Sequence, residues 1–172
     1  MPENVLVACI GNIFLGDDGF GFEVARALAA RSLPPGVEVV DYGIRGLDLA
    51  YALLRPWRAA IIVDALAQTG APNPLPPGTL RLLRPADVQA PTAQCPDGAK
   101  AVTPARVLAT ARSLAEVGAE IYILACQPQL HANHPEHRVG LSPAVAEAIP
   151  AAAGIILDLA GRLTAAGQVC AA

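Results

Sequence analysis

An apolar run followed by a glycine- and aspartate-rich turn restricts the fold of this chain more than any other feature. Val5–Ile10 is unbroken in its apolar character, as expected for a strand that is buried on both faces of a sheet. The turn Gly11-Asn-Ile-Phe-Leu-Gly-Asp-Asp18 follows, and apolar residues then recur at helical spacing over 20–30. This order predicts the first unit of an α/β fold, with the turn at the carboxyl edge of the sheet, where open α/β folds bind ligands.

The alternation of strand and helix continues to the end of the chain. Further strands are predicted at 37–42, 59–64, 79–83 and 120–126, and further helices at 47–54, 103–117 and 142–163. We therefore predict an α/β fold in a single domain over residues 1–172. Its three layers comprise a mostly parallel twisted sheet of about five strands and helices on both faces. The segment at 79–83 is expected to be an antiparallel edge strand.

Composition and charge narrow the class of protein. Hydrophobic residues make up 53% of the 172 residues, but no segment reaches the roughly 20 consecutive apolar residues of a bilayer-spanning helix. The start of the chain lacks the basic stretch of a signal peptide, so we expect a cytoplasmic protein with no membrane partner. The net charge is −3, the arginines are scattered and Lys100 is the single lysine, which argues against nucleic acid as a main partner.

The four cysteines show no metal-binding pattern. Cys9, Cys95, Cys126 and Cys170 lack the C-x-x-C spacing. Cys9 and Cys126 lie inside predicted strands, and we interpret them as small buried hydrophobic residues.

Carboxylates stand at the end of three successive strand units. Asp17 and Asp18 precede the first helix, Asp41 ends the second strand and Asp64 ends the third. If the strand order is 2-1-3, these acids lie along one edge of the sheet. Grouped carboxylates either bind a cation or share a proton, and we favour a cation. One imidazole added to this set would shift its preference toward nickel or zinc.

The neighbouring acids, glycines and histidines each allow more than one interpretation. Of Asp17 and Asp18, we expect one to interact with the helix N-terminus and the other to face the crevice. The glycines of Gly43-Ile-Arg-Gly46 serve either as turn residues or as a place where the backbone approaches a ligand. The histidines of 131–137 are spaced by three, but Pro135 opposes a helix there, so a solvated loop is favoured over a metal site. The sequence has no G-x-S-x-G or P-loop motif.

Five segments of the chain resemble the maturation proteases of nickel–iron hydrogenases. They are Ile10-Gly-Asn-Ile-Phe-Leu-Gly-Asp-Asp-Gly-Phe-Gly21, Val40–Leu49, Ile61–Ala65, Val102–Leu108 and Gly140–Val145, and the resemblance covers nearly the whole chain. Members of this family are cytosolic endopeptidases that remove a short C-terminal extension from the hydrogenase large-subunit precursor after nickel insertion. The resemblance implies a metal-dependent or metal-recognising peptidase. We expect the protein to be a monomer. Nickel is expected to come with the substrate, and no organic cofactor is expected.

The resemblance also implies site residues. The metal site of the family comprises two acids and one histidine, and the two acids match Asp18 and Asp64. Asp41 matches a further acid typical of the family, and we include it with Asp18 and Asp64 among the expected catalytic residues. The expected substrate contacts are Gly11, Asn12, Gly43, Gly46 and Lys100.

Lys100 departs from the family pattern, because it stands where the family histidine is expected. A protonated ammonium group is no metal ligand and would repel a cation, although it could pair with Asp18 or Asp64. Three explanations stay open. The third ligand comes from the histidines of 131–137, the site uses carboxylates with the substrate's own ligands, or the protein binds its substrate without the usual nickel contact. The last explanation gives an alternative function, a maturation factor that binds the precursor without cleaving it.

Two further classes of function agree less well with the sequence. A nucleotide-binding or other small-molecule-binding α/β module would carry G-x-G-x-x-G after its first strand, which this chain lacks. An enzyme similar to peptidyl-tRNA hydrolase would place a histidine soon after the Gly-Asn turn, but the first histidine here is His131.

Overall fold

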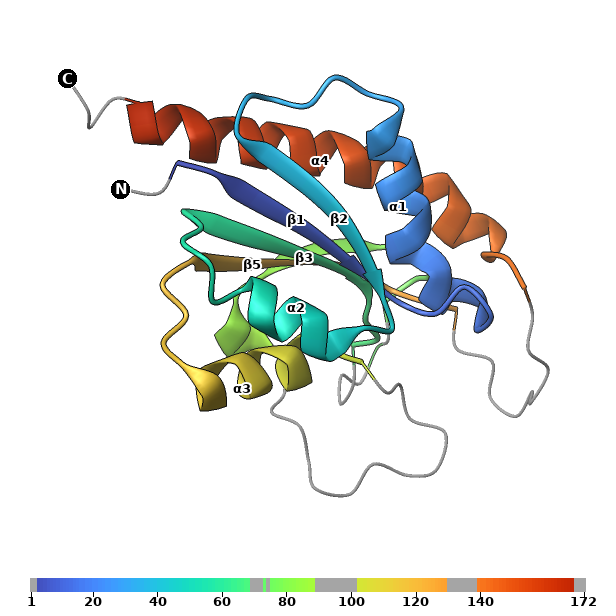
Figure 1. The fold of residues 1–172 in the computed structure, drawn as a ribbon. Coiled ribbons are helices and arrows are strands. Elements are labelled where there is room, and N and C mark those ends of the chain that lie inside the picture. Colours follow the sequence, from blue (N-terminus) through green and yellow to red (C-terminus); the bar gives the residue numbers. More distant parts are fainter. Residues whose placement is uncertain (1–2, 69–72, 74, 89–101, 130–138, 169–172) are drawn as a thin grey trace.

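The sheet has the strand order that the sequence predicts. The computed structural model describes residues 3–68, 73, 75–88, 102–129 and 139–168. Within these ranges the sheet contains β1 (Val5–Ile10), β2 (Val37–Gly43), β3 (Ala59–Ala65), β4 (Leu80–Leu83) and β5 (Glu120–Cys126). Their order is β2-β1-β3-β5-β4, and only the β4–β5 pairing among them is antiparallel (Figure 1). The predicted order 2-1-3 and the antiparallel edge strand are therefore confirmed.

Helices cover both faces of this sheet. One face carries α1 (Phe20–Ala29) and α4 (Pro143–Gln168), and the other carries α2 (Gly46–Ala52) and α3 (Pro104–Leu114) (Figure 1). Two short 3₁₀ turns, η1 (Gly16–Gly19) and η2 (Pro85–Asp87), complete the described elements. Together these layers confirm the predicted three-layer α/β fold.

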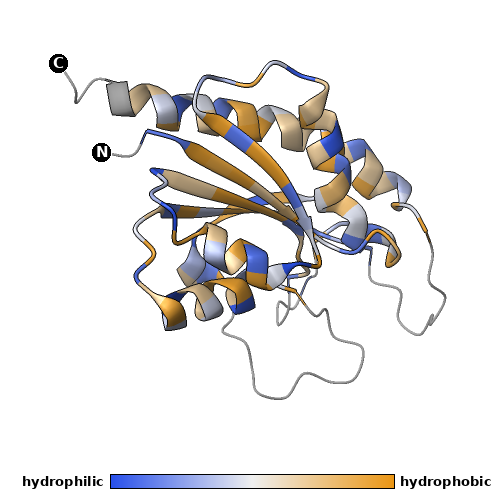
Figure 2. Ribbon diagram, in the orientation of Figure 1, coloured by the Kyte–Doolittle hydropathy of each residue, from blue (hydrophilic) through white to orange (hydrophobic). Residues whose placement is uncertain are grey.

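The core lies on both sides of the two central strands. Every residue of β1 and β3 is buried, and Figure 2 shows these strands as largely hydrophobic. Side chains alternate between the two faces, so Val7 and Val63 belong to the cluster under α1 and α4, while Leu6 and Ile62 belong to the cluster under α2 and α3. The unbroken apolar runs are thus explained by burial on both faces.

The two C-terminal helices differ from their predicted ends. α3 ends at Leu114 and not near Val117, because the backbone of Ala115 is extended. α4 continues through Pro150 to Gln168, beyond the predicted end near 163. Pro150 is exposed on this helix. Because proline has no N–H, one carbonyl of the preceding turn receives no helical hydrogen bond, and this carbonyl lies on the solvent side.

α4 is by length and composition long and apolar enough to cross a membrane. In this structure, however, one side of the helix packs on the sheet, where Val145, Ala152 and Ile156 are at most 1% exposed. The buried residues recur every three or four positions, as in an amphipathic helix that covers a core. The apolar composition of α4 is therefore accounted for by packing in the domain.

Candidate active site

The carboxyl ends of β1, β2 and β3 form one edge, and those predicted site residues that the structure describes lie at it. Cys9 on β1 stands opposite Asp41 on β2 and opposite Val63 on β3. Asp64 is the next residue of β3. The loops after β1 and β2 are joined at their bases by a hydrogen bond from the Gly11 N–H to the Gly43 carbonyl, at 3.0 Å.

Asp18 is held at this edge by the turn that precedes it. Its Oδ2 atom accepts a hydrogen bond from the Asn12 N–H at 2.8 Å, and its own N–H donates to the Leu15 carbonyl at 3.1 Å. Its carbonyl lies directly against Gly11, whose φ is +144°. A Cβ atom at position 11 would collide with that carbonyl, so only glycine permits this packing. Asp18 itself is half-buried.

Asp64 lies on an element that contacts η1. It is fully buried, between Val63 and Ala65, which both face α1 and α4. Strand alternation therefore places Asp64 on the face of α2 and α3. Because η1 packs against β3, the structure brings the two elements that carry Asp18 and Asp64 into contact.

The described residues do not supply a third ligand for the metal site predicted at Asp18 and Asp64. Among the residues that the structure describes, no group of three or more His, Cys, Asp or Glu side chains is arranged to hold a metal ion. Lys100 and the histidines of 131–137 lie outside the described residues. The three explanations that the sequence allows for the third metal ligand therefore all remain.

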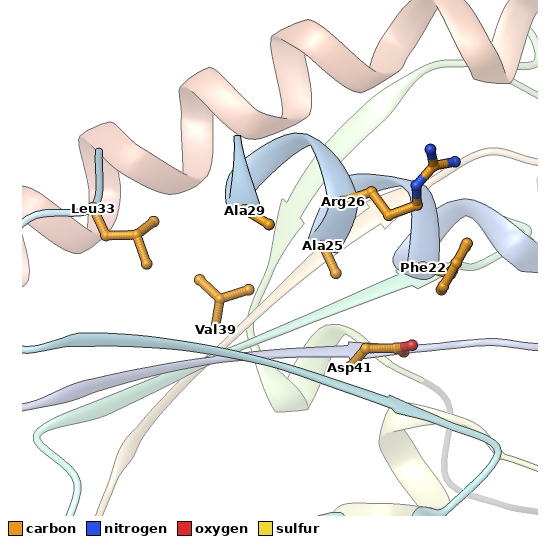
Figure 3. Close-up of a pocket in the computed structure, with 7 residues that line it drawn as sticks. All are labelled: Phe22, Ala25, Arg26, Ala29, Leu33, Val39 and Asp41. Atoms are coloured by element: carbon orange, nitrogen blue, oxygen red, sulfur yellow. The ribbon is translucent and has the colours of Figure 1, made fainter. Parts of the chain in front are cut away.

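Asp41 occupies the opposite face of the sheet from Asp64. It lies in a groove of about 440 Å³ between α1 and β2, together with Phe22, Arg26 and Val39 (Figure 3). Its Oδ1 atom accepts a hydrogen bond from the Gly43 N–H at 2.9 Å, and its carbonyl accepts one from Arg45 Nη2 at 2.6 Å. These contacts shape the turn after β2, and the catalytic role of Asp41 stays a prediction.

Cys9 and Cys126 are both buried and form no disulfide, which agrees with the interpretation of structural thiols. Burial, and to a smaller extent the charge of Asp41, raises the pKa of the Cys9 thiol far above its usual value. Burial and then the charge of Asp17 raise the pKa of Cys126 to about 12. Neither thiol ionises near neutral pH, so neither is a nucleophile in the folded protein.

Asp17 has a different contact from the one expected. It was expected that one acid of the pair would serve the helix that follows, yet the Asp17 carboxylate accepts hydrogen bonds from Gln129 and from Ser142, which directly precedes α4. It therefore supports the N-terminus of α4 and not that of α1. The local sequence gave no indication of this because the partners are 112 and 125 residues away.

The glycines at the edge allow close packing of backbone. Gly43 has a φ of +53°, as a turn glycine does, and Gly46 packs against Val102 and Val107. A Cβ atom on Gly21 would lie 2.9 Å from the Ile10 nitrogen and 3.0 Å from the Val63 carbonyl oxygen, and closer still to the Ile10 carbonyl. α1 thus starts directly on the ends of β1 and β3. Contacts of Gly11, Asn12, Gly43 and Gly46 with a substrate stay predictions.

Sequence reasoning gave no role to Gln127, although it organises the same edge. Its side chain is 1% exposed, and its Oε1 atom accepts a hydrogen bond from the Gln68 N–H at 2.8 Å. Its backbone N–H donates to the Thr79 carbonyl at 2.8 Å. Gln127 therefore fixes the chain that leaves β3. The signal in the sequence that could have identified Gln127 is its position as a polar residue directly after an apolar strand.

Exposed apolar side chains surround the edge, and sequence reasoning missed them too. We call them the apolar rim: Ile13, Phe14, Leu15, Ile44 and Leu47. Phe14 and Ile44 are the most open, at 62% and 63% exposure. Phe14 and Ile44 come from the adjoining loops after β1 and β2, and Leu47 lies in the first turn of α2. Exposed apolar side chains that gather beside a site are typical of a surface that binds another protein.

The comparisons with known proteins agree with this fold. The family model for hydrogenase maturation protease (HycI) matches residues 22–159. The chain is 34% identical to the hydrogenase expression/formation protein HupD of Rhodobacter capsulatus, over 84% of this chain and 65% of HupD. It is 32% identical to the coenzyme F420 hydrogenase subunit delta of Methanothermobacter thermautotrophicus, over 91% of this chain and 94% of that subunit.

A solved structure supports the same assignment. The hydrogenase maturating endopeptidase HybD from E. coli superposes with a TM-score of 0.67, at 28% identity and with 91% of each chain covered. The match of the family model, over residues 22–159, covers most of the chain. This chain belongs to the hydrogenase maturation protease family, a family of hydrolases.

Proposed function

We propose that this protein is an endopeptidase that removes the C-terminal extension of a nickel-loaded hydrogenase large-subunit precursor. The observation that carries the proposal is the packing of η1 on β3, which brings the segments of Asp18 and Asp64 together at the carboxyl edge of the sheet. Membership of the family supports the reaction, and the carboxylates support the use of a metal in recognition. We also propose that the protein is a cytoplasmic monomer.

Nickel in this proposal is part of the substrate. Nickel bound in the precursor docks on Asp18 and Asp64, which places the scissile peptide bond and disfavours a precursor without metal. A water molecule then attacks the carbonyl carbon, the carbon–nitrogen bond breaks, and the leaving nitrogen takes a proton. Either the metal or a carboxylate activates that water. The substrate's own ligands complete the coordination of nickel.

Burial distinguishes the two carboxylates. Asp18 is half-buried, whereas Asp64 is fully buried in the protein without its substrate. Asp18 is therefore the more accessible of the two to nickel in the precursor. The apolar rim supplies a surface for contact with a protein substrate.

The test is tail removal from nickel-loaded precursor by Asp18→Asn and Asp64→Asn. Both changes keep the shape of the side chain and remove its charge, so we expect each variant to lose about 100-fold or more in rate. Asp158→Asn is the control, because Asp158 is exposed on α4 and pairs only loosely with Arg162, at 3.7 Å. Wild-type rates in both site variants would contradict the proposal.

Asp41→Asn tests the predicted catalytic role of Asp41. An asparagine retains an oxygen that can accept the Gly43 N–H, so the turn after β2 should survive. Loss of tail removal in the folded variant would support a catalytic contribution by the charge. Retained activity would limit Asp41 to the turn.

The alternative is a maturation factor that binds the precursor and does not cleave it. The observation that favours it is Lys100, which stands in the place of the family histidine. Intact-mass analysis of the precursor before and after incubation separates the two functions. An unchanged mass together with a stable complex would support the alternative.

A further inference from the structure

The carboxylate of Asp17 joins η1 to two distant parts of the chain. Its Oδ2 atom accepts hydrogen bonds from the Gln129 N–H at 2.8 Å and from the Ser142 hydroxyl at 2.9 Å. Its Oδ1 atom accepts a hydrogen bond from the Ser142 N–H at 2.6 Å. Gln129 follows β5 and Ser142 directly precedes α4. One side chain thus connects the end of β5, the start of α4 and the turn that carries Asp18.

The opposite side of η1 rests on the chain just before it. Asn12 donates to Oδ2 of Asp18, and the carbonyl of Asp18 packs on Gly11. These contacts come from residues 11–15 and fix Asp18 relative to its own loop. Asp17 adds contacts with the far part of the chain. Leu141, next to Ser142, also lies against Gly19 at the end of η1.

We propose that Asp17 is a positioning residue, which holds η1 so that the carboxylate of Asp18 keeps its place beside β3. The kinetic part of this inference rests on the proposed function, while the structural part does not. Asp17 contacts neither the scissile bond nor the metal in this scheme. It acts through Asp18, its neighbour in the same 3₁₀ turn.

The charge and both oxygens of Asp17 are needed for this role. Two backbone N–H groups and one hydroxyl converge on the two oxygens. An asparagine has one oxygen and one NH₂ group, and an NH₂ group cannot accept from a backbone N–H. In either orientation of the amide, Asp17→Asn therefore loses the bond from Gln129 or the bond from Ser142. Bonds to a carboxylate are also stronger than bonds to a neutral amide.

Four variants distinguish the loss of the Asp17 contact from a general loss of stability. Asp17→Asn breaks the contact, Ser142→Ala removes only the hydroxyl bond, and Ser142→Thr keeps a hydroxyl. Asp87→Asn is the matched control. Asp87 also lies in a 3₁₀ turn and accepts a backbone N–H, from Arg84 at 2.8 Å, but it belongs to η2 beside β4.

The first measurement is amide hydrogen exchange in the protein without substrate. The Asn12 amide is the reporter, because it donates to Asp18 Oδ2. The Ile62 amide, in the centre of β3, reports global unfolding. We expect Asp17→Asn to speed exchange at Asn12 relative to Ile62 by about tenfold, as for the loss of one bond to a charged group. Ser142→Ala should give a smaller change, and Ser142→Thr and Asp87→Asn should stay within about twofold of wild type.

The second measurement is kcat/KM for tail removal from nickel-loaded precursor, at equal concentrations of folded protein. We expect Asp17→Asn to lower it by about tenfold or more, and the other variants to follow the same order as in exchange. Unchanged exchange at Asn12 relative to Ile62 would overturn the inference. Faster exchange with unchanged kcat/KM would also overturn it, since Asp17 would then only stabilise the fold. If wild type cleaves nothing, the proposed function fails, and exchange at Asn12 alone decides whether Asp17 holds Asp18.

Discussion

The two ends of the parallel strands are built from different contacts. At the carboxyl end, backbone lies directly on backbone: Gly11 meets the Asp18 carbonyl, and Gly21 meets the ends of β1 and β3. At the amino end, no atom lies within 4 Å of a Cβ placed on Gly118, just before β5. Exposed side chains make contacts there, beside backbone hydrogen bonds such as that from the Glu120 N–H to the Arg58 carbonyl at 3.0 Å. Arg84 pairs with Glu120 at 2.8 Å and lies over the ring of Tyr122, at 3.9 Å from its centroid.

This difference indicates where the molecule tolerates change. Backbone contacts at van der Waals distance leave no room for an added atom, and the interior resists displacement because it is close-packed. Exposed ion pairs are screened by water and contribute little. The carboxyl end is therefore the more closely packed end around these glycines, and it is the end that carries Asp18 and Asp64. Three predictions can break or sharpen this contrast.

The largest effect is expected for an added methyl group at each end. Gly21→Ala forces a Cβ atom into the backbone of β1 and β3, and we expect it to lower the free energy of unfolding by about 3 kcal/mol or more. Gly118→Ala is the matched change at the amino end, and we expect it to stay within about 0.5 kcal/mol of wild type. Denaturant unfolding measures both. Equal losses would remove the contrast between the ends.

A smaller effect is expected at the apolar rim. The double variant Phe14→Ala/Ile44→Ala removes exposed side chains, so its stability should stay close to that of wild type. If the rim binds the precursor, we expect KM for tail removal to rise by about tenfold with little change in kcat. Leu82→Ala is the control, since Leu82 is similarly exposed on β4. An unchanged KM in the double variant would show that the precursor binds elsewhere.

The smallest effect is expected from the amino-end ion pair, through its pH dependence. The Tyr122 hydroxyl and then the Arg84 guanidinium lower the pKa of Glu120 below its usual value. A lowered pKa in the folded state gives stability above the unfolded value of about 4.3, which is lost as the pH falls through the folded value. Because Glu120 is 49% exposed, we expect Glu120→Gln to cost less than about 1 kcal/mol at neutral pH.

Urea unfolding of wild type and of Glu120→Gln between about pH 7 and pH 3 measures this dependence. The stabilities of the two proteins should draw closer as the pH falls and Glu120 takes up its proton. A difference that is independent of pH would mean that Glu120 acts through packing and not through its charge.

The sequence predicted the fold well where local pattern decides it. Val5–Ile10 and Glu120–Cys126 form strands over the predicted residues, because unbroken apolar runs bounded by turns leave few alternatives. Helix ends were less accurate. Helix α3 ends at Leu114, three residues before the predicted end, and Pro150 does not interrupt α4, because both depend on what surrounds the chain.

The candidate site was predictable in part, for the same reason. Asp18 comes after β1 and Asp64 lies near the end of β3, and the apolar pattern identifies both strands. Parallel strands bring their carboxyl ends to one edge. The faces were not predicted: Asp41 and Asp64 lie on opposite sides of the sheet, as the alternation of side chains along each strand requires. The positions of the strand ends predict the edge of the sheet at which an acid lies, but not the face of the sheet that its side chain occupies.

The sequence by itself determined the α/β class, the five strands with one antiparallel edge, and the edge where the carboxylates lie, because these follow from short-range periodicity. Only the tertiary structure decided that Asp17 binds Gln129 after β5 and Ser142 before α4, that Asp64 is fully buried, and that Gly21 marks a contact between helix and strand. Each of these depends on atoms that are distant along the chain and adjacent in space, which a local pattern does not encode.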